Sequence, residues 1–316
     1  MVATAASLAV AGYGMLLGAR LVIALSQALF WSVVTPVAAG LFAAPVRGRA
    51  LSILFGGSSL AGVLGVPVGT WIGQQAGWRI AFLAMSGLGL VALAVVATLL
   101  PTTPAGGGAT DHGSAPDAGR YRALVITTAL AVTGGFTAFT YVSPFLTDVS
   151  GLAETAVGPV LFARGAAGVL GVALVGLVVD RRPWLTMVVV IVVQGVALLL
   201  QYVFGAQAWA GAATVALAGL GIAALAAVLG ARVLIVAPGS SDMASAGMST
   251  AFNVGITAGA LIGGLLLPAF GVRSTALVGA VFSVVALAVV LAEPALASDR
   301  RGTAAGGARL PPAGAR

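Results

Sequence analysis

The sequence predicts an all-α membrane protein made of two helical bundles, the first of them N-terminally truncated. Hydrophobic residues make up 60% of the 316 residues and charged residues only 7%, and the mean hydropathy is +1.11. About a quarter of the residues in a soluble domain are charged, so this composition is typical of a protein embedded in lipid. Ten apolar stretches recur along the chain, and most reach the roughly 20 residues that a membrane span needs.

A polar segment at 101–121 separates four of these stretches from the other six. Because a backbone inside a bilayer must satisfy its own hydrogen bonds, each stretch is predicted to be a helix. The first is only about half a span, which leaves about nine full spans and a partial one. The predicted spans are 2–11, 14–40, 50–73, 80–100, 122–146, 158–179, 184–204, 208–236, 245–268 and 274–292.

Four regions follow from this segmentation. The linker is rich in Pro, Gly and polar residues, a composition that favours a flexible connection. The C-terminal tail contains mainly Gly, Ala, Pro and Arg and is predicted to be disordered. The regions are an incomplete N-terminal bundle at 1–100, a linker at 101–121, a six-helix C-terminal bundle at 122–292 and a tail at 293–316.

The arginines predict the orientation of the chain in its membrane. Only Arg79 and Arg273 lie near span ends on one side. Because cytoplasmic loops carry the excess of basic residues, the opposite side is predicted to be cytoplasmic, together with the linker and the C-terminus of this multi-pass protein of the cell membrane. That side holds Arg47, Arg49, Arg120, Arg122, Arg181, Arg182, Arg232, Arg300 and Arg301.

Composition also excludes several kinds of chemistry. The net charge of +7 is spread over short loops instead of one basic face, so nucleic acid is not an expected partner. Cysteine is absent, which excludes disulfides and thiolate ligands. The single histidine, His112, lies in the linker. We therefore expect no metal, no cofactor and no enzymatic activity. We also expect the protein to be a monomer in the lipid bilayer.

Small residues recur at four-residue spacing in two of the predicted spans. This spacing places them on one helix face, where a second backbone can pack closely. Each ridge lies in the next-to-last span of its half, which indicates an internal repeat with a site between the halves. The alternative is that the two ridges serve only the packing of helices and mark no site. The first ridge is Gly57, Ala61, Gly65, Gly69 and Gly73, and the second is Gly247, Ala251, Gly255, Gly259 and Gly263.

Five stretches resemble motifs of the major facilitator superfamily, and specifically of its drug:proton antiporters of the arabinose-efflux type. Gly65-Val66-Pro67-Val68-Gly69 resembles the antiporter motif of the fifth helix, and Pro67 should kink that helix or stiffen its rim. The others are Arg20 with Gln27, Phe30 and Trp31 in the fourth helix; Gly176 to Asp180, Arg181 and Arg182 after the eighth; Phe139 to Leu146 in the seventh; and Ala251 to Gly255 in the eleventh.

The resemblance implies twelve helices in two halves of six, so helices one, two and most of three would be absent here. It further implies transport motifs at Arg20, Gly65, Pro67, Gly69, Asp180, Arg181 and Arg182, and a substrate cavity with Gln27, Trp31, Phe139, Tyr141 and Asn253 as candidate lining residues.

Each of these residues also has a structural interpretation. Arg20 either belongs to a proton or substrate relay or extends to water at the outer rim of its membrane span. Arg164 is expected at the rim of its span. Arg181 and Arg182, with Asp180, lock one conformation or only orient the chain. Gln27 and Trp31 either contact a solute or serve ordinary packing between helices. Asn253 is expected to hold helices together.

The function predicted from these observations is a transmembrane transporter. It would export a small amphipathic solute or drug by alternating access, with protons as the coupling ion. No carboxylate lies in the middle of a predicted span, so the proton carrier is not evident. The alternatives are an uptake or sugar-efflux permease of the same fold, or an inactive truncated remnant in which the ridge from Gly247 to Gly263 lacks a partner helix.

Overall fold

The computed structural model describes residues 13–40, 61–99, 114–179 and 181–296, and within them every regular element is helical. In the first half, α2 spans Tyr13–Gly40, the π-helix η2 (Ala61–Gly65) runs into α4 (Val66–Ala76), and α5 spans Trp78–Leu99. The second half contains α6 (Ala118–Phe139), α7 (Val142–Pro144), the π-helix η3 (Phe145–Val149), α8 (Glu154–Val178), α9 (Pro183–Phe204), α10 (Ala208–Val236), α11 (Ser241–Phe270) and α12 (Ser274–Leu296).

These helices confirm the predicted all-α membrane fold. Within the described ranges, seven helices are long and apolar enough to cross a membrane: α5, α6 and α8 to α12. The predicted partial span at 2–11 and the first part of the span at 50–73 lie outside the described residues. The span predicted at 208–236 has the bounds of α10, and α11 and α12 extend a few residues beyond their predicted spans.

The span predicted at 122–146 is not one continuous helix. It begins earlier, at Ala118, inside the stretch predicted as linker, and is interrupted after Phe139 before α7 and η3 continue to Val149. Pro144 explains the interruption, because its ring would clash with the carbonyl four residues earlier, at Thr140. The turn is closed by the backbone N–H of Tyr141, which donates to the carbonyl of Ala138 at 3.3 Å.

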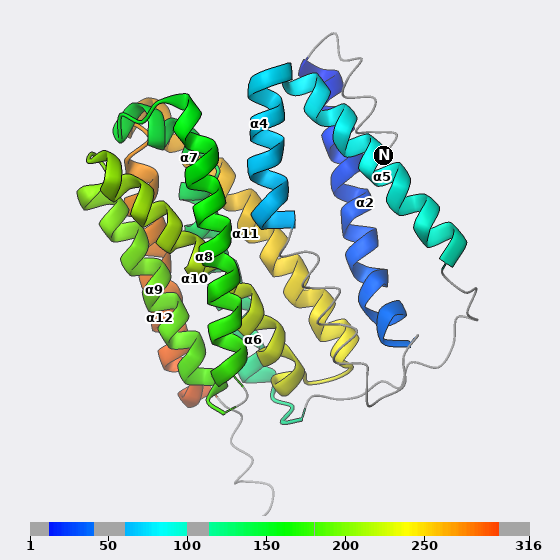
Figure 1. Cartoon of the computed structure of the whole chain (residues 1–316). Helices are drawn as coiled ribbons and strands as arrows, with labels where there is room; N and C mark the ends of the chain where they lie inside the picture. The colour runs from blue at the N-terminus through cyan, green and yellow to red at the C-terminus, as the bar shows by residue number, and fades with distance from the viewer. Residues whose placement is uncertain (1–12, 41–60, 100–113, 180, 297–316) are drawn as a thin grey trace, which may run out of the picture.

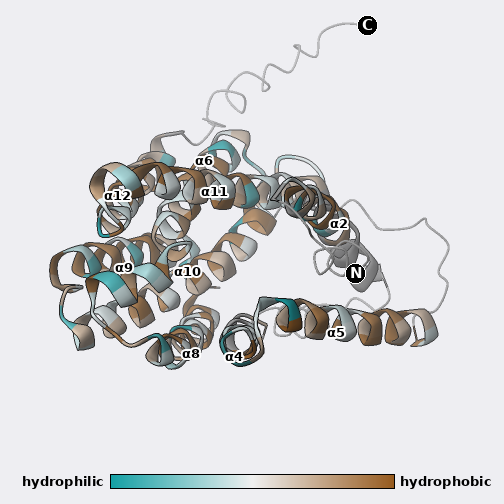
Figure 2. Cartoon of the chain, turned by 90° about the horizontal axis from the view of Figure 1, so that it is seen from above, coloured by the Kyte–Doolittle hydropathy of each residue, from teal (hydrophilic) through white to brown (hydrophobic). Residues whose placement is uncertain are grey.

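The helices of the second half form one bundle, seen end-on in Figure 2. In this bundle α10 packs against α8 and α9, while α6 packs against α11 and α12. The largest buried cluster joins these elements through residues such as Leu124, Ile191, Leu225 and Leu229. The side chain of Gln194 on α9 crosses the bundle, because its Nε2 donates to the Ala131 carbonyl at 2.7 Å and to Ser283 Oγ at 3.3 Å. Six helices of the second half therefore contribute to one core.

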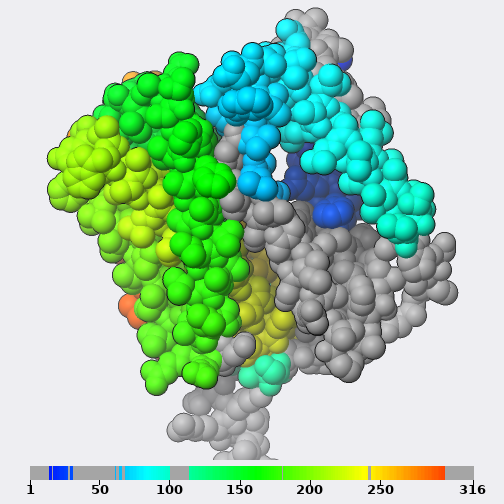
Figure 3. Space-filling view, viewed as in Figure 1, coloured from blue at the N-terminus to red at the C-terminus, as the bar shows by residue number. Residues whose placement is uncertain are grey.

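The first-half helices lie to one side of this bundle and meet it through α4 and α2 (Figures 1 and 3). Helix α4 packs beside α8, and α2 lies near α11. At the end of α4, Gln74 Nε2 donates to the backbone carbonyl of Glu154, the first residue of α8, at 3.0 Å. This hydrogen bond joins the two halves at the end of the molecule opposite to the start of α6.

The second small-residue ridge packs directly against α6. A Cβ built on Gly259 would lie 2.6 Å from the Thr133 carbonyl oxygen, and one built on Gly255 would lie 2.9 Å from that of Ala129. At Gly263 it would lie 2.4 Å from the Tyr141 ring. The expectation that this ridge would lack a partner in a truncated chain is therefore wrong, because the partner is α6 of the same half.

The first ridge differs from the second. At Gly65, Gly69 and Gly73 an added Cβ meets no heavy atom of the described residues within 4 Å. The backbone is irregular where Pro67 was expected to disturb it, since the π-helix η2 gives way to α4 directly before this proline. Matching sequence ridges therefore differ in packing: the α11 ridge packs closely on α6, whereas Gly65, Gly69 and Gly73 have no close neighbour among the described residues.

Candidate functional site

Arg164 is a cation near the middle of a membrane helix. It is the eleventh residue of the 25-residue helix α8, which places it roughly 15 Å along the helix from its N-terminal end. Its guanidinium lies over the ring of Phe139, 3.8 Å from the centroid. No ion pair or hydrogen bond of this guanidinium is formed with the described residues. An unpaired charge at this depth is costly, so such residues usually mark a functional site.

The position of Arg164 corrects the expectation that it reaches the rim. Gly219 on α10 allows α8 to approach closely, since a Cβ there would lie 2.3 Å from the Arg164 carbonyl oxygen. The side chain then extends along α6 to Phe139 and beside the buried Gln201 of α9 instead of toward the helix end. The stacking on Phe139 supplies a cation–π interaction that compensates part of the lost hydration.

Aromatic side chains continue from Phe139 along α6 and α11. The rings of Phe136 and Phe139 meet edge to face with centroids 5.6 Å apart, and Phe136 meets Phe252 of α11 at 6.5 Å. All three rings are partly exposed. Next to Phe252, Asn253 is exposed, and its Nδ2 donates to the Ser249 carbonyl of its own helix at 2.8 Å. Asn253 was expected to pack helices together, but this hydrogen bond stays within α11.

Tyr141 joins two helices. Its hydroxyl donates to the Ala260 carbonyl of α11 at 2.7 Å, and its ring fills the space beside Gly263. The hydroxyl therefore fastens the interrupted end of α6 to α11. Its predicted contact with a solute stays a prediction.

The candidate residues of the first half are arranged along α2 and α4. The guanidinium of Arg20 lies over the Phe82 ring of α5 at 5.0 Å from the centroid, and Gln27 is exposed on the same helix as Arg20. The side chains of Trp31 and Pro67 lie outside the part of the structure that is described. Among the described residues, the structure thus does not bring Arg20 into contact with Arg164 or with the rings of Phe139 and Phe136.

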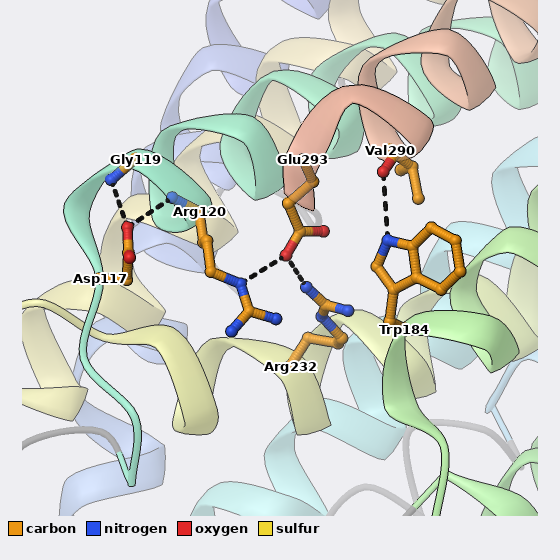
Figure 4. Close-up of polar contacts among 7 residues, drawn as sticks. All are labelled: Asp117, Gly119, Arg120, Trp184, Arg232, Val290 and Glu293. Carbon is orange, nitrogen blue, oxygen red and sulfur yellow. Dashed lines mark hydrogen bonds and ion pairs between the residues drawn. The ribbon is translucent and has the colours of Figure 1, made fainter. Parts of the chain in front are cut away.

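A cluster of charges lies at the end of the second-half bundle where α6 begins (Figure 4). Glu293 of α12 accepts a hydrogen bond from Arg120 of α6 at 3.0 Å and a short one from Arg232 of α10. The side chains of Arg232 and Glu293 are each only 1% exposed. Beside them, Trp184 Nε1 donates to the Val290 carbonyl at 3.1 Å. Three helices are therefore tied together through one carboxylate.

The end of the linker is part of the same structure. The carboxylate of Asp117 accepts from the backbone N–H groups of Gly119 and Arg120 and so caps α6. Backbone N–H groups of Ser114 and Ala115 donate to the carbonyls of Leu234 and Ile235 at 3.3 and 2.8 Å. These carbonyls belong to the last turn of α10 and have no partner within their own helix. The linker thus completes the hydrogen bonding of α10.

The sequence analysis missed the pairing of these charges. Arg232 was counted among the residues that only orient the chain, and Glu293 was placed at the beginning of the tail. Arg232 lies four residues before the end of α10, and Glu293 three residues before the end of α12. The available signal was an arginine inside the end of one predicted apolar span and a glutamate directly after the end of another, because such charges are seldom buried unpaired.

Arg181 and Arg182 follow α8 and are exposed. Their guanidinium groups have no hydrogen-bond or ion-pair partner among the described residues. Asp180, expected to act with them, lies outside the described residues. The conformational lock predicted from these three residues therefore stays a prediction.

A bundle of apolar helices long enough to cross a membrane, with a cation and aromatic rings at mid-depth, is compatible with a membrane transporter. The sequence comparison agrees, since the family model described as Major Facilitator Superfamily matches residues 1–200 and again 124–314. The chain therefore belongs to the major facilitator superfamily, which is a family of transporters and not of enzymes. Two staggered matches to one model are what an internally repeated chain produces.

The relatives of this chain are bacterial transporters. It is 34% identical over 288 residues to the MFS-type transporter YtbD of Bacillus subtilis (strain 168), covering 88% of the chain and 71% of the relative. It is 33% identical over 278 residues to a probable sugar efflux transporter of Helicobacter acinonychis (strain Sheeba) and 32% identical over 280 residues to one of Helicobacter pylori (strain J99), each covering 87% of the chain and 71% of the relative.

Solved structures show the same fold. A bacterial homologue of the human lysosomal transporter Spinster, in an inward-facing and unoccupied conformation, matches with a TM-score of 0.61 at 17% identity, over 93% of this chain and 80% of that chain. The inward-facing and occupied conformation matches with a TM-score of 0.55 at 18% identity, over the same shares.

Proposed function

We propose that this transporter exports a small amphipathic solute from the cell and exchanges it for protons by alternating access. The observation that carries the proposal is Arg164, a cation without a counter-ion among the described residues, beside the partly exposed rings of Phe139 and Phe136. An apolar portion of a solute can lie on these rings, while a polar or anionic group accepts hydrogen bonds from the guanidinium. The resemblance of Gly65 to Gly69 to an antiporter motif supports protons as the coupling ion.

The packing of the two halves supports a rocking movement between them. The second-half bundle is held together by its own core and by the Glu293 cluster, whereas the hydrogen bond of Gln74 joins the described parts of the two halves at one end. A well-packed bundle that meets the other helices through a small contact can rock against them about a site between the halves.

Sugar efflux is the second candidate. It is favoured by the relatives of Helicobacter, whose names describe probable sugar efflux transporters. Arg164 and the rings of Phe139 and Phe136 are compatible with this candidate as well. Sugar hydroxyls accept hydrogen bonds from a guanidinium, and the apolar face of a pyranose packs on an aromatic ring.

An export assay tests the proposed function. Cells that express the chain are loaded with a fluorescent amphipathic dye or with a labelled sugar, and efflux is followed with and without a protonophore. We expect dye efflux that the protonophore abolishes. Efflux of the sugar alone would establish the second candidate, and efflux indifferent to the protonophore would contradict proton exchange.

Replacement of Arg164 by glutamine is expected to lower the initial rate of this efflux. The loss of a hydrogen bond to a charged group costs about 1.5–3 kcal/mol, which corresponds to a rate roughly 10 to 100 times lower at limiting solute concentration. Arg79→Gln is the matched control, because Arg79 also stacks on an aromatic ring, that of Trp78, but in the first turn of α5. Equal efflux by Arg164→Gln and wild type, at equal membrane content, would remove Arg164 from the site.

The proposed orientation, with the linker in the cytoplasm of a cell-membrane protein, is tested by cysteine labelling. The chain contains no cysteine, so single substitutions have no background. Ser114 and Ala206 are both exposed and lie at opposite ends of the second-half bundle. In intact cells a membrane-impermeant maleimide is expected to label Ala206→Cys and to label Ser114→Cys only after lysis. The reverse pattern would invert the orientation.

A further inference from the structure

An apolar groove runs along the outside of the second-half bundle between α8 and α9. It has a volume of about 470 Å³. Both helices pack on α10, which forms the floor of the groove with Leu220 and Ala224. Figure 2 shows α9 on the side of the bundle away from α2 and α5, and the groove lies between this helix and α8. This groove therefore faces the lipid and not the space between the halves.

The walls of the α8–α9 groove are apolar and accessible. Leu174 is 57% exposed, and Val189 on the opposite wall is 51% exposed. The groove extends from Arg182 to Val193 of α9, which is roughly 15 Å along the helix and half of the hydrocarbon thickness of a bilayer. Its length thus matches the acyl chain of a lipid in one leaflet.

Two arginines lie at the interfacial end of this groove. Arg181 and Arg182 both line it, both are exposed, and neither guanidinium has a partner among the described residues. Asp180 precedes them in the sequence, so the segment 180–182 has two positive charges and one negative, a net charge of +1. Basic residues above an apolar groove between membrane helices match the headgroup and the acyl chain of an anionic phospholipid.

We propose that the α8–α9 groove is a binding site for an anionic phospholipid. The phosphodiester accepts hydrogen bonds from Arg181 and Arg182, and one acyl chain lies between Leu174 and Val189. The proposal depends on the groove and on the arginines at its end, and not on the solute or the direction of transport. Lipid in this site joins α8 to α9, which otherwise have few contacts with each other.

Native mass spectrometry of the full, delipidated chain in detergent tests this proposal, with phosphatidylglycerol and phosphatidylcholine titrated separately. Wild type is expected to retain phosphatidylglycerol more strongly than phosphatidylcholine. The double variant Arg181→Gln, Arg182→Gln should bind phosphatidylglycerol roughly 10- to 30-fold more weakly, the effect expected of two interfacial arginines. Arg122→Gln is the matched control, because Arg122 is exposed at the same end of the bundle but does not line the groove.

Leu174→Trp tests the groove separately from the charges. The larger side chain fills the space of the acyl chain, so retention of phosphatidylglycerol should fall while Arg181 and Arg182 are unchanged. Equal retention of the two lipids by wild type would overturn the proposal, as would unchanged binding by the double arginine variant. Unchanged binding by Leu174→Trp would show that the headgroup binds without the groove and would overturn it too.

Discussion

The variant Gly259→Ala is expected to unfold at a temperature about 5 °C lower than wild type in detergent, since overpacking typically costs about 1–3 kcal/mol. The added Cβ would lie 2.6 Å from the carbonyl oxygen of Thr133 and 2.9 Å from the backbone nitrogen of Thr137. Both are backbone atoms of α6, so no side-chain rotation relieves the clash, and α11 must move away from α6. A thermal unfolding curve of the purified protein measures the midpoint.

Gly230→Ala is the control for this substitution. Gly230 lies within α10, and a Cβ there meets no heavy atom of the described residues within 4 Å. Alanine is a better helix former than glycine by about 1 kcal/mol, so this variant should be unchanged or slightly more stable. If Gly259→Ala and Gly230→Ala had the same midpoint, the close packing of the α11 ridge on α6 would be refuted.

Neutralisation of Glu293 is expected to have the largest effect on stability. In Glu293→Gln the buried guanidinium of Arg232 loses its counter-charge, while Arg120, whose side chain is 31% exposed, can regain water. Removal of one partner of a buried ion pair costs about 3–5 kcal/mol. The unfolding midpoint in detergent should fall by more than in Gly259→Ala.

A double-mutant cycle separates the ion pair from simple packing. The variant Arg232→Leu, Glu293→Leu removes both charges, and replacement of a buried pair by apolar residues is often close to neutral. We therefore expect the double variant to be more stable than Arg232→Leu or Glu293→Leu alone. Additive losses in the two single variants would show that the charges do not interact.

The fold could be predicted from the sequence because the membrane leaves few alternatives. Long apolar stretches must be helices in lipid, and hydropathy alone located α9, α10 and α12 within a few residues. The interruption of α6 was missed because Pro144 acts at a distance of four residues, on the carbonyl of Thr140, within a stretch that remains apolar.

The site could be predicted only in part. Phe139 and Asn253 were named from motifs and lie on or beside the aromatic surface, whereas Arg164 was expected at the rim. Its depth depends on the position at which α8 begins and on the close approach permitted by Gly219 of α10, a contact between residues 55 positions apart in the sequence. Charge pairs such as Arg232 and Glu293 likewise depend on which helix ends adjoin, and spacing along the chain does not reveal this.

The proposed mechanism requires that the two halves move relative to each other during transport. In the double variant Gln74→Cys, Glu154→Cys, a reagent that carries two maleimides and a cleavable disulfide can join α4 to α8 where the halves are hydrogen-bonded, in a chain otherwise free of cysteine. Each single-cysteine variant treated with the same reagent is the control. We expect that the cross-linked transporter stops exporting solute and that reductive cleavage of the cross-link restores export. Undiminished export by fully cross-linked protein would contradict it.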